Sequence, residues 1–312
     1  AKPRYLTKSR FKTAMECPTK LFYTGKSGIY ADAKQEDEFL QALAEGGFQV
    51  GELAKLMYPG GVEVTADTHQ AQIDETRRLL ERDEVTLFEA AICHDGLFAR
   101  VDILRKTGPQ VELIEVKAKS FDSRARSLFR GAPGGIDRGM HPYLLDVAFQ
   151  RHVMSLAYPH LRGVSYLMPA DKSRTCSIDG LNQRFKIRRQ DGRPVVSVAP
   201  GTDAGSVGTP ILKAVNVDQF VDEILMVPLT APGASGLLAD LARDWAQQYR
   251  ADARITPSVG AHCAKCEFRT SAATAGLRSG LHECWKIAKG WTDQDFAKGS
   301  VLDLWNFKGK QK

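Results

Sequence analysis

Two carboxylates and a lysine lie in neighbouring apolar segments of the sequence. Asp102 stands within ARVDIL, and Glu115 and Lys117 stand within LIEVKAKS. Side chains alternate along a strand, so Glu115 and Lys117 point to one face. If the two segments pair through a turn near residues 107–110, Asp102 faces Glu115. This pattern predicts a hard-oxygen site for Mg²⁺ or Mn²⁺, beside a lysine that can stabilise charge developing on a phosphate.

An alternation of Glu and Lys is also common on exposed strands, where it only aids solubility. The apolar neighbours of Asp102 and Glu115 favour a site, because ionisable groups in apolar strands are costly unless they are paired or bind metal. Glu89, in the preceding LFEAA segment, is a second candidate metal ligand if its side chain reaches the same face, and a plain structural carboxylate is the alternative. The expected chemistry is metal-dependent hydrolysis of a phosphodiester bond.

Three of the six cysteines cluster near the end of the chain. Cys263 and Cys266 form a CxxC pair, and Cys284 follows 18 positions after Cys266. A fourth ligand from Cys17 would suit an iron–sulfur cluster, whereas His262 or His282 would complete a Cys₃His zinc site. Pro18 follows Cys17 directly, and we expect it to end a helix and expose the thiol.

Basic residues gather in two segments of a chain whose formal net charge is only +6 over 312 residues. Residues 121–143 lack periodicity and read as a loop, and residues 184–200 read as a hairpin that turns at Asp191-Gly192. The candidate contacts to nucleic-acid phosphates in these segments are Arg124, Arg126, Arg130, Arg188 and Arg189. A solvated face is the alternative for some of them.

The elements that must position these residues follow from hydrophobic periodicity. It predicts helices over 36–57, 67–82, 144–158, 216–226 and 237–249. Three β-rich segments between residues 85 and 120 predict a meander, and residues 163–170 predict another strand. Residues 199–210 and 227–236 read as linkers. The fold class is therefore α/β, with a sheet flanked by helices.

These residues together resemble the RecB-like branch of the PD-(D/E)xK nucleases, and more closely its iron–sulfur members. That group includes the CRISPR spacer-acquisition nuclease and the nuclease domain of the AddB helicase-nuclease subunit. The likeness is carried by LTKSRFKTAMECP, VGELAKLMYPGG, FEAA, ARVDIL, LIEVKAKS, AFQRHV and the C-terminal CxxC…C, from about Leu6 to Cys284.

The resemblance implies a restriction-endonuclease-like core with a central mixed β-sheet flanked by helices. Asp102 and Glu115 would bind the metal, Lys117 would be the catalytic lysine and Gln150 would support the site. Cys17, Cys263, Cys266 and Cys284 would hold a 4Fe–4S cluster that joins the N- and C-terminal segments. The long gap between Cys266 and Cys284 leaves a zinc site as the alternative to the iron–sulfur cluster.

The resemblance also implies a domain over residues 1–290, with residues 291–312 as a tail or the start of a further domain. Its expected substrate is DNA, single- or double-stranded, in repair, recombination or anti-phage defence, with protein partners in such a complex. The alternatives are a catalytically decayed nucleic-acid-binding module and a zinc-stabilised subunit of a larger defence complex.

No apolar run reaches the ~20 residues of a membrane span, and the N-terminal residues carry no apolar signal segment. We therefore expect a cytoplasmic protein that makes no membrane contact. The few, clustered cysteines agree with that compartment, because disulfide scaffolds belong to oxidising ones.

Overall fold

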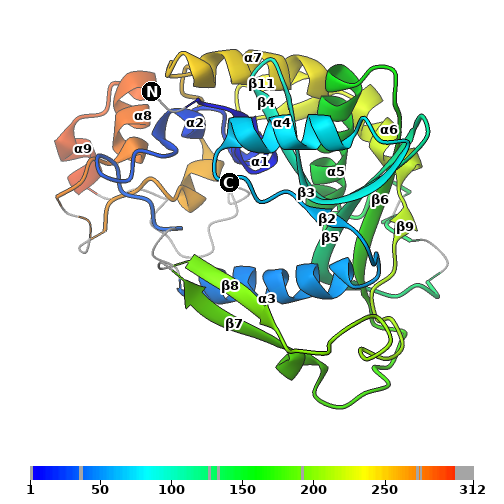
Figure 1. The fold of residues 1–312 in the computed structure, drawn as a ribbon. Helices are drawn as coiled ribbons and strands as arrows, with labels where there is room; N and C mark the ends of the chain where they lie inside the picture. The colour runs from blue at the N-terminus through cyan, green and yellow to red at the C-terminus, as the bar shows by residue number, and fades with distance from the viewer. Residues whose placement is uncertain are drawn as a thin grey trace. The chain divides into compact units, whose positions relative to one another are not determined.

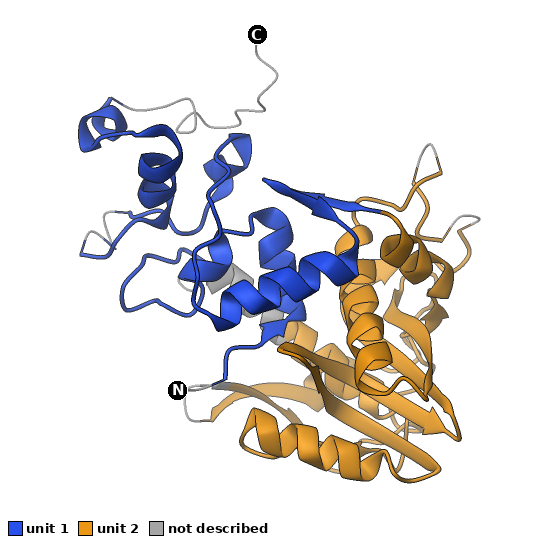
Figure 2. Cartoon of the chain, turned by 90° about the horizontal axis from the view of Figure 1, so that it is seen from above, with its two compact units in different colours: residues 1–38, 228–312 blue, residues 39–227 orange. Residues whose placement is uncertain are grey.

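The computed structural model describes residues 3–34, 38–125, 128–131, 134–190, 193–271, 274 and 276–298. The chain divides into two compact units (Figure 2). Unit 1 combines residues 1–38 with residues 228–312, and unit 2 holds residues 39–227. The N-terminal segment thus belongs to the same unit as the C-terminal cysteines. None of the helices in the described ranges is long and apolar enough to cross a membrane.

Unit 2 is built on a mixed sheet with helices around it (Figure 1). Its strands are β2 (Val62–Glu63), β3 (Glu84–His94), β4 (Leu97–Thr107), β5 (Gln110–Phe121), β6 (Arg162–Asp171) and β9 (Val215–Asn216). They join in the order β2–β3–β4–β5–β6–β9. The expected meander is confirmed, because β3, β4 and β5 pair antiparallel; β5 and β6 pair parallel, and β6 and β9 antiparallel.

The remaining elements of unit 2 follow the predicted order. They are α3 (Glu38–Lys55), α4 (His69–Leu79), α5 (His141–Ala157), the short helix η1 (Leu181–Arg184), the hairpin strands β7 (Phe185–Gln190) and β8 (Arg193–Val198), and α6 (Asp218–Met226). The predicted hairpin is confirmed in the pairing of β7 with β8. Its predicted turn, Asp191-Gly192, lies outside the described residues.

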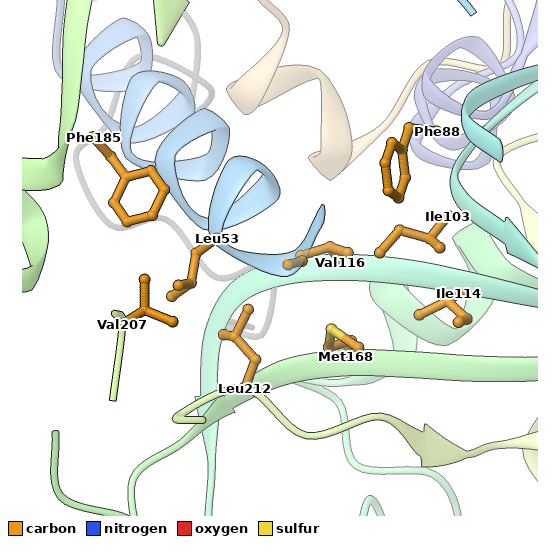
Figure 3. Packing of buried hydrophobic residues seen from close by; sticks show 10 residues of the cluster. Leu53, Phe88, Ile103, Ile114, Val116, Met168, Phe185, Val207 and Leu212 are labelled. Carbon is orange, nitrogen blue, oxygen red and sulfur yellow. The ribbon is translucent and has the colours of Figure 1, made fainter. Parts of the chain in front are cut away.

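An apolar core joins α3 to one face of the sheet. Leu53 packs with Phe88, Ile103, Ile114 and Val116, which come from β3, β4 and β5 (Figure 3). Because neighbouring residues on a strand point to opposite faces, Glu115 and Lys117 belong to the other face. That face is where α5 contacts β3, β4, β5 and β6.

Helix α5 differs from its sequence prediction in two ways. It begins at His141, before the predicted residue 144, and Pro142 lies in its first turn, where a missing N–H costs nothing. Of the residues that share one face by helical spacing, Leu145 and Phe149 are buried, whereas Leu156 near the end of the helix is 38% exposed. Residues 144–150 are buried without interruption, because the helix is covered by the sheet and also contacts α6.

Unit 1 contains shorter elements. From the N-terminal segment come β1 (Leu6–Thr7), α1 (Lys8–Glu16) and α2 (Lys20–Tyr23), and from the C-terminal one β10 (Leu229–Ala231), β11 (Ala234–Gly236), α7 (Leu238–Arg250), the short helix η2 (Ala261–Lys265), α8 (Gly280–Lys289) and α9 (Asp293–Ala297). Phe11 of α1 is fully buried and its ring lies 5.3 Å from that of Trp245 in α7. This contact ties the two sequence segments of the unit together.

Three details of unit 1 refine the sequence prediction. The expected linker over 227–236 is instead largely a small antiparallel hairpin, β10–β11, whose turn Gly233 adopts φ +75°. The expectation that Pro18 exposes Cys17 is wrong, because the residue is only 9% exposed. The first residues of the predicted tail pack on α8: Trp291 contacts Trp285, and Phe296 stacks on His282. Residues 299–312 lie outside the described ranges.

Candidate functional site

Asp102 lies where the pairing of β4 with β5 changes. The registered pairs run from Thr107–Gln110 to Ile103–Ile114, and the same register would next place Asp102 opposite Glu115. At this point the backbone N–H of Val116 donates to Asp102 Oδ2 at 2.7 Å. The Asp102 carboxylate therefore accepts a hydrogen bond from the neighbouring strand and is fixed beside the Glu115 position.

Glu115, Lys117 and Gln150 meet on the face covered by α5. Lys117 Nζ lies 2.5 Å from Glu115 Oε1, and Gln150 Nε2 donates to Glu115 Oε2 at 2.5 Å. Gln150 also donates to the backbone oxygen of Arg100 at 3.2 Å. Glu115 and Gln150 are fully buried, whereas the Lys117 side chain is 23% exposed. The Lys117 side chain is thus held by a buried carboxylate while part of it still reaches solvent.

Asp146 belongs to the same group and was missed in the sequence. Its Oδ2 lies 3.4 Å from Lys117 Nζ, and the residue is 1% exposed. Asp146 precedes Gln150 by four positions on α5, a spacing that places both on one helix face. An aspartate inside the apolar run LLDVAF was the available signal, because a charge buried there needs a partner.

Glu89 has an unusual backbone. It lies in β3 between the registered pairs Phe88–Ile103 and Ala90–Val101, and so it stands next to Asp102 in the register. Its φ of 56° is in the left-handed region, which is costly for a residue with a side chain. Glu89 Oε2 lies 4.0 Å from Arg100 Nε, and its side chain is 35% exposed.

The donor set of this face suits a hard cation. Asp102 and Glu115 come from adjacent strands, and Mg²⁺ in proteins often takes one or two carboxylates and completes its shell with water and substrate phosphates. Within the described ranges, no group of three or more His, Cys, Asp or Glu side chains is arranged to hold a metal ion. The two carboxylates are therefore candidate ligands that would share a cation with water and substrate.

The predicted phosphate-contacting arginines lie in different environments. Arg188 and Arg189 are exposed on β7, and Arg124 is exposed beside Asp122. Arg130 is engaged within the fold: its Nη1 lies 2.6 Å from Glu223, and its guanidinium lies over the ring of Phe220. Arg126 lies outside the described residues.

A buried carboxylate, also missed in the sequence, fixes the start of the basic loop. Asp171 Oδ1 accepts hydrogen bonds from the backbone N–H groups of Ser123 and Ser173, each at 3.1 Å, and from Ser173 Oγ at 2.7 Å. Burial opposes ionisation of Asp171, but the hydrogen bonds outweigh it and hold its pKa well below the ordinary value. The segment after β5 is thereby tied to the end of β6.

The four predicted cysteine ligands line one cavity in unit 1. Cys17 follows α1, Cys263 lies in η2, Cys266 follows η2 and Cys284 lies in α8. The cavity has a volume of about 20 Å³, enough for about one water molecule. The donor set is that of a four-thiolate cluster. In the described ranges no three of these side chains are arranged to hold a metal ion, so binding of a cluster would require the cysteine side chains to change position.

Burial disfavours ionisation of three of these thiols, those of Cys17, Cys266 and Cys284. Burial raises the pKa of Cys266 to about 12 and that of Cys284 to about 11, and it also raises the pKa of Cys17. Metal binding by these groups would therefore release protons. Cys93 and Cys176 do not line this cavity.

Two side chains of α2 border the cavity and were not singled out in the sequence. Tyr23 Oη lies 3.3 Å from Cys284 Sγ, within hydrogen-bonding distance. Lys20 is 6% exposed and forms ion pairs with Glu16 at 2.7 Å and Glu267 at 2.5 Å. The predicted helix break at Pro18 places both residues on a separate short helix next to Cys17.

The two histidines considered as zinc ligands lie in different places. His262 lines the cysteine cavity, and its Nε2 lies 3.7 Å from Cys263 Sγ. His282 stacks on Phe296, with ring centroids 4.0 Å apart, and does not line that cavity. His262 is therefore the better placed of the two for a Cys₃His site.

Comparison with known proteins provides no relative for this geometry. The chain matches no family model, no curated protein and no solved structure. Function must then be inferred from the chain's own residues.

Proposed function

We propose that this chain is a metal-dependent nuclease that hydrolyses phosphodiester bonds of DNA. The observation that carries the proposal is the meeting of Asp102, Glu115 and Lys117 on one face of the sheet. Glu115 and Lys117 lie 2.5 Å apart, and the backbone hydrogen bond from Val116 fixes Asp102 next to them. This set is the one that the sequence resemblance assigns to catalysis in a restriction-endonuclease-like core.

The carboxylates of Asp102 and Glu115 would hold the Mg²⁺ or Mn²⁺ ion. When bound, such an ion polarises the scissile phosphate and lowers the pKa of a coordinated water. Glu115 is kept in place by Gln150, whose amide also bonds to the β4 backbone at Arg100. Gln150 therefore fixes the distance between α5 and the two strands that carry the carboxylates.

Lys117 supplies a positive charge at the solvent-accessible end of the site. Its ammonium pairs with Glu115 and Asp146, and because the side chain is 23% exposed, we expect a substrate phosphate to reach it from solvent. Its three N–H donors can stabilise the negative charge that grows on phosphate oxygens during hydrolysis. Asp146 limits the positions that the long side chain can adopt.

Lys117→Ala tests the proposal, with Lys119→Ala as the matched control. Both lysines lie on β5, but Lys119 is exposed outside the group around Glu115. With Mg²⁺ or Mn²⁺ and single- or double-stranded DNA, we expect Lys117→Ala to lose cleavage by about 10²–10³-fold. Lys119→Ala should keep it. Equal cleavage by wild type and Lys117→Ala would reject the assignment.

A decayed nucleic-acid-binding module gives a different result in the same experiment. Wild-type protein would then bind DNA in a salt-dependent way without cleaving it, whichever divalent metal is added. The complete Asp–Glu–Lys set is the reason to favour the enzyme, because a decayed site has no need to keep charges buried.

The proposal includes a structural 4Fe–4S cluster bound by Cys17, Cys263, Cys266 and Cys284. Its support is the convergence of all four cysteines on one cavity from three separate parts of the sequence. A cluster there would tie the N-terminal segment to the C-terminal segment within unit 1. That unit contains both segments and has few extended strands to hold them together.

Metal analysis of anaerobically purified protein tests the cluster. We expect brown protein with broad visible absorbance and about four irons per chain. Cys266→Ser should lose the colour, whereas Cys93→Ser, which changes a cysteine of unit 2 outside the cavity, should retain it. Colourless protein with one zinc per chain would reject the cluster and indicate a Cys₃His or Cys₄ zinc site instead.

A further inference from the structure

A second polar site lies on unit 1, beside α8 and outside the cysteine cavity. It is a surface hollow with a volume of about 490 Å³. Its lining includes Arg254, Arg278, His282, Glu283, Lys286 and Ile287. Basic side chains predominate in this lining, and none of them is among the arginines predicted to contact phosphates.

One carboxylate holds both arginines. Glu283, whose side chain is 16% exposed, lies 2.5 Å from Arg254 Nη2 and also forms an ion pair with Arg278. Tyr30 Oη donates to both oxygens of this carboxylate, at 3.3 and 3.2 Å. Tyr30 is only 4% exposed, so Glu283 is itself anchored to buried structure.

Aromatic rings support the same two guanidinium groups. Arg254 lies over the ring of Phe22 at 4.4 Å, and Arg278 lies over the ring of Tyr30 at 5.2 Å. A guanidinium fixed by a carboxylate on one edge and a ring on its face retains further N–H donors for a ligand. Holding these side chains in advance lowers the entropy cost of binding an anion.

The charges of the hollow favour an anion. Arg254, Arg278 and Lys286 carry three positive charges against two negative ones, those of Glu283 and of Asp293 beside Lys286, which leaves one positive charge in excess. Asp293, which is not in the lining, pairs with Lys286 at 2.6 Å. Planar guanidinium groups match the geometry of phosphate oxygens, so phosphate is the anion that this pair of arginines fits best.

The hollow is open and not enclosed. The side chain of Arg278 is 63% exposed and that of Lys286 is 44% exposed, and Ile287 at the rim is 53% exposed. Small ligands usually bury most of their surface in a pocket. An open basic hollow with an apolar rim better suits a polymer that continues across the surface.

We propose that this hollow binds backbone phosphates of a nucleic-acid strand, with Arg254 and Arg278 as the contacting groups. The choice of a nucleic acid as the polymer rests on the proposed nuclease function. The site lies entirely in unit 1, so it would hold substrate independently of the carboxylates in unit 2.

The test measures binding of a fluorescein-labelled single-stranded DNA to the full chain in a chelator, where cleavage cannot occur. The variants are Arg278→Gln and Arg254→Gln/Arg278→Gln, and the matched control is Lys289→Gln, an exposed cation on α8 outside the hollow. We expect about tenfold weaker binding for Arg278→Gln at low salt. For the double variant, the slope of log K against log salt should become shallower by about 1.4, since each lost phosphate contact on a single strand removes about 0.7.

Unchanged affinity and slope in the double variant, or equal losses in Lys289→Gln, would overturn the inference. Circular dichroism of each variant establishes that it is folded. Arg278→Gln leaves Arg254 in place over the ring of Phe22, so this single variant tests the hollow without changing that contact. Binding of ATP or inorganic phosphate at this hollow without binding of the strand would also overturn it. Cleavage with Mg²⁺ is measured separately, so loss of binding without any wild-type cleavage supports this site while rejecting the nuclease.

Discussion

Lys117→Met should destabilise unit 2 because it removes the ammonium that lies 2.5 Å from a fully buried carboxylate. Methionine keeps most of the aliphatic length of lysine, so the change removes charge more than volume. Breaking a buried ion pair from one side costs about 3–5 kcal/mol. Because Lys117 is 23% exposed, we expect the lower end, about 3 kcal/mol.

A second substitution, Glu115→Gln, tests whether the destabilisation comes from leaving the Glu115 carboxylate without its ion-pair partner. In Lys117→Met/Glu115→Gln, a neutral amide replaces the carboxylate and can still bond to Gln150. The double variant should therefore recover about 2 kcal/mol of the loss, with Asp146 accounting for part of the remainder. Lys119→Met, on the same strand but exposed, should change stability by less than about 0.5 kcal/mol.

Urea unfolding followed by far-UV circular dichroism measures the effect. A loss of about 3 kcal/mol lowers the midpoint by about 1.5 M if the urea dependence is about 2 kcal/mol/M. All four tryptophans, at positions 245, 285, 291 and 305, lie outside residues 39–227, so their fluorescence reports on unit 1 and serves as a reference. If Lys117→Met is as stable as wild type, or if the double variant is less stable than the single one, the ion pair between Lys117 and the buried Glu115 does not stabilise unit 2.

Three further changes test other parts of the structure. Tyr23→Phe removes the hydroxyl that lies 3.3 Å from Cys284 Sγ. In iron-loaded protein we expect a more negative reduction potential of the cluster, because hydrogen bonds to the ligand sulfur stabilise the reduced cluster. A redox titration followed by visible absorbance measures this potential. The pKa of Asp171 is lowered in the folded state, so its contribution to stability is complete above its unfolded pKa of about 3.9 and is lost as the pH falls toward the lower folded pKa. In urea titrations, the stability difference between wild type and Asp171→Asn should therefore shrink below about pH 4. A difference that stays constant with pH would contradict this. Phe11→Ala leaves a void beside Trp245 and should cost about 3–5 kcal/mol, measured by tryptophan fluorescence during urea unfolding; a loss below about 1 kcal/mol would show that this contact does not hold the segments of unit 1 together.

Much of the fold could be predicted from the sequence, because local patterns determine it. The turns at residues 95–96 and 107–109 separate three β-rich segments, and the structure contains β3, β4 and β5 in those places. Apolar stripes located α3, α4, α6 and α7 to within a few residues. Period and turn chemistry are properties of neighbouring residues, so they can be read before any long-range contact is known.

The partners of the buried polar groups could not be read in this way. Asp146 contacts Lys117 only because α5 packs on the face of the sheet that carries Lys117. Periodicity alone would place Gln150 on the solvent-facing side of an amphipathic helix, and only the family resemblance assigned it to the site. The structure buries it, because α5 is covered on most of its circumference and Gln150 is 0% exposed. The environment of a helix face depends on which elements cover it, and one segment of sequence does not contain that information.

The sequence by itself determined the chemical inventory of this protein: a carboxylate–lysine set at strand spacing, a CxxC pair with distant cysteines, and arginine-rich segments. Residue types and alternation along a strand are enough to place Glu115 and Lys117 on one face. Only the tertiary structure decided that Asp146 joins them and that the Gln150 amide bonds to Glu115. It also decided that Cys17 lines a cavity with three cysteines nearly 250 residues away or more, and that Glu283 orients two arginines around a hollow. Those contacts depend on the packing of segments far apart in the chain, where the cost of burying charge selects the partners.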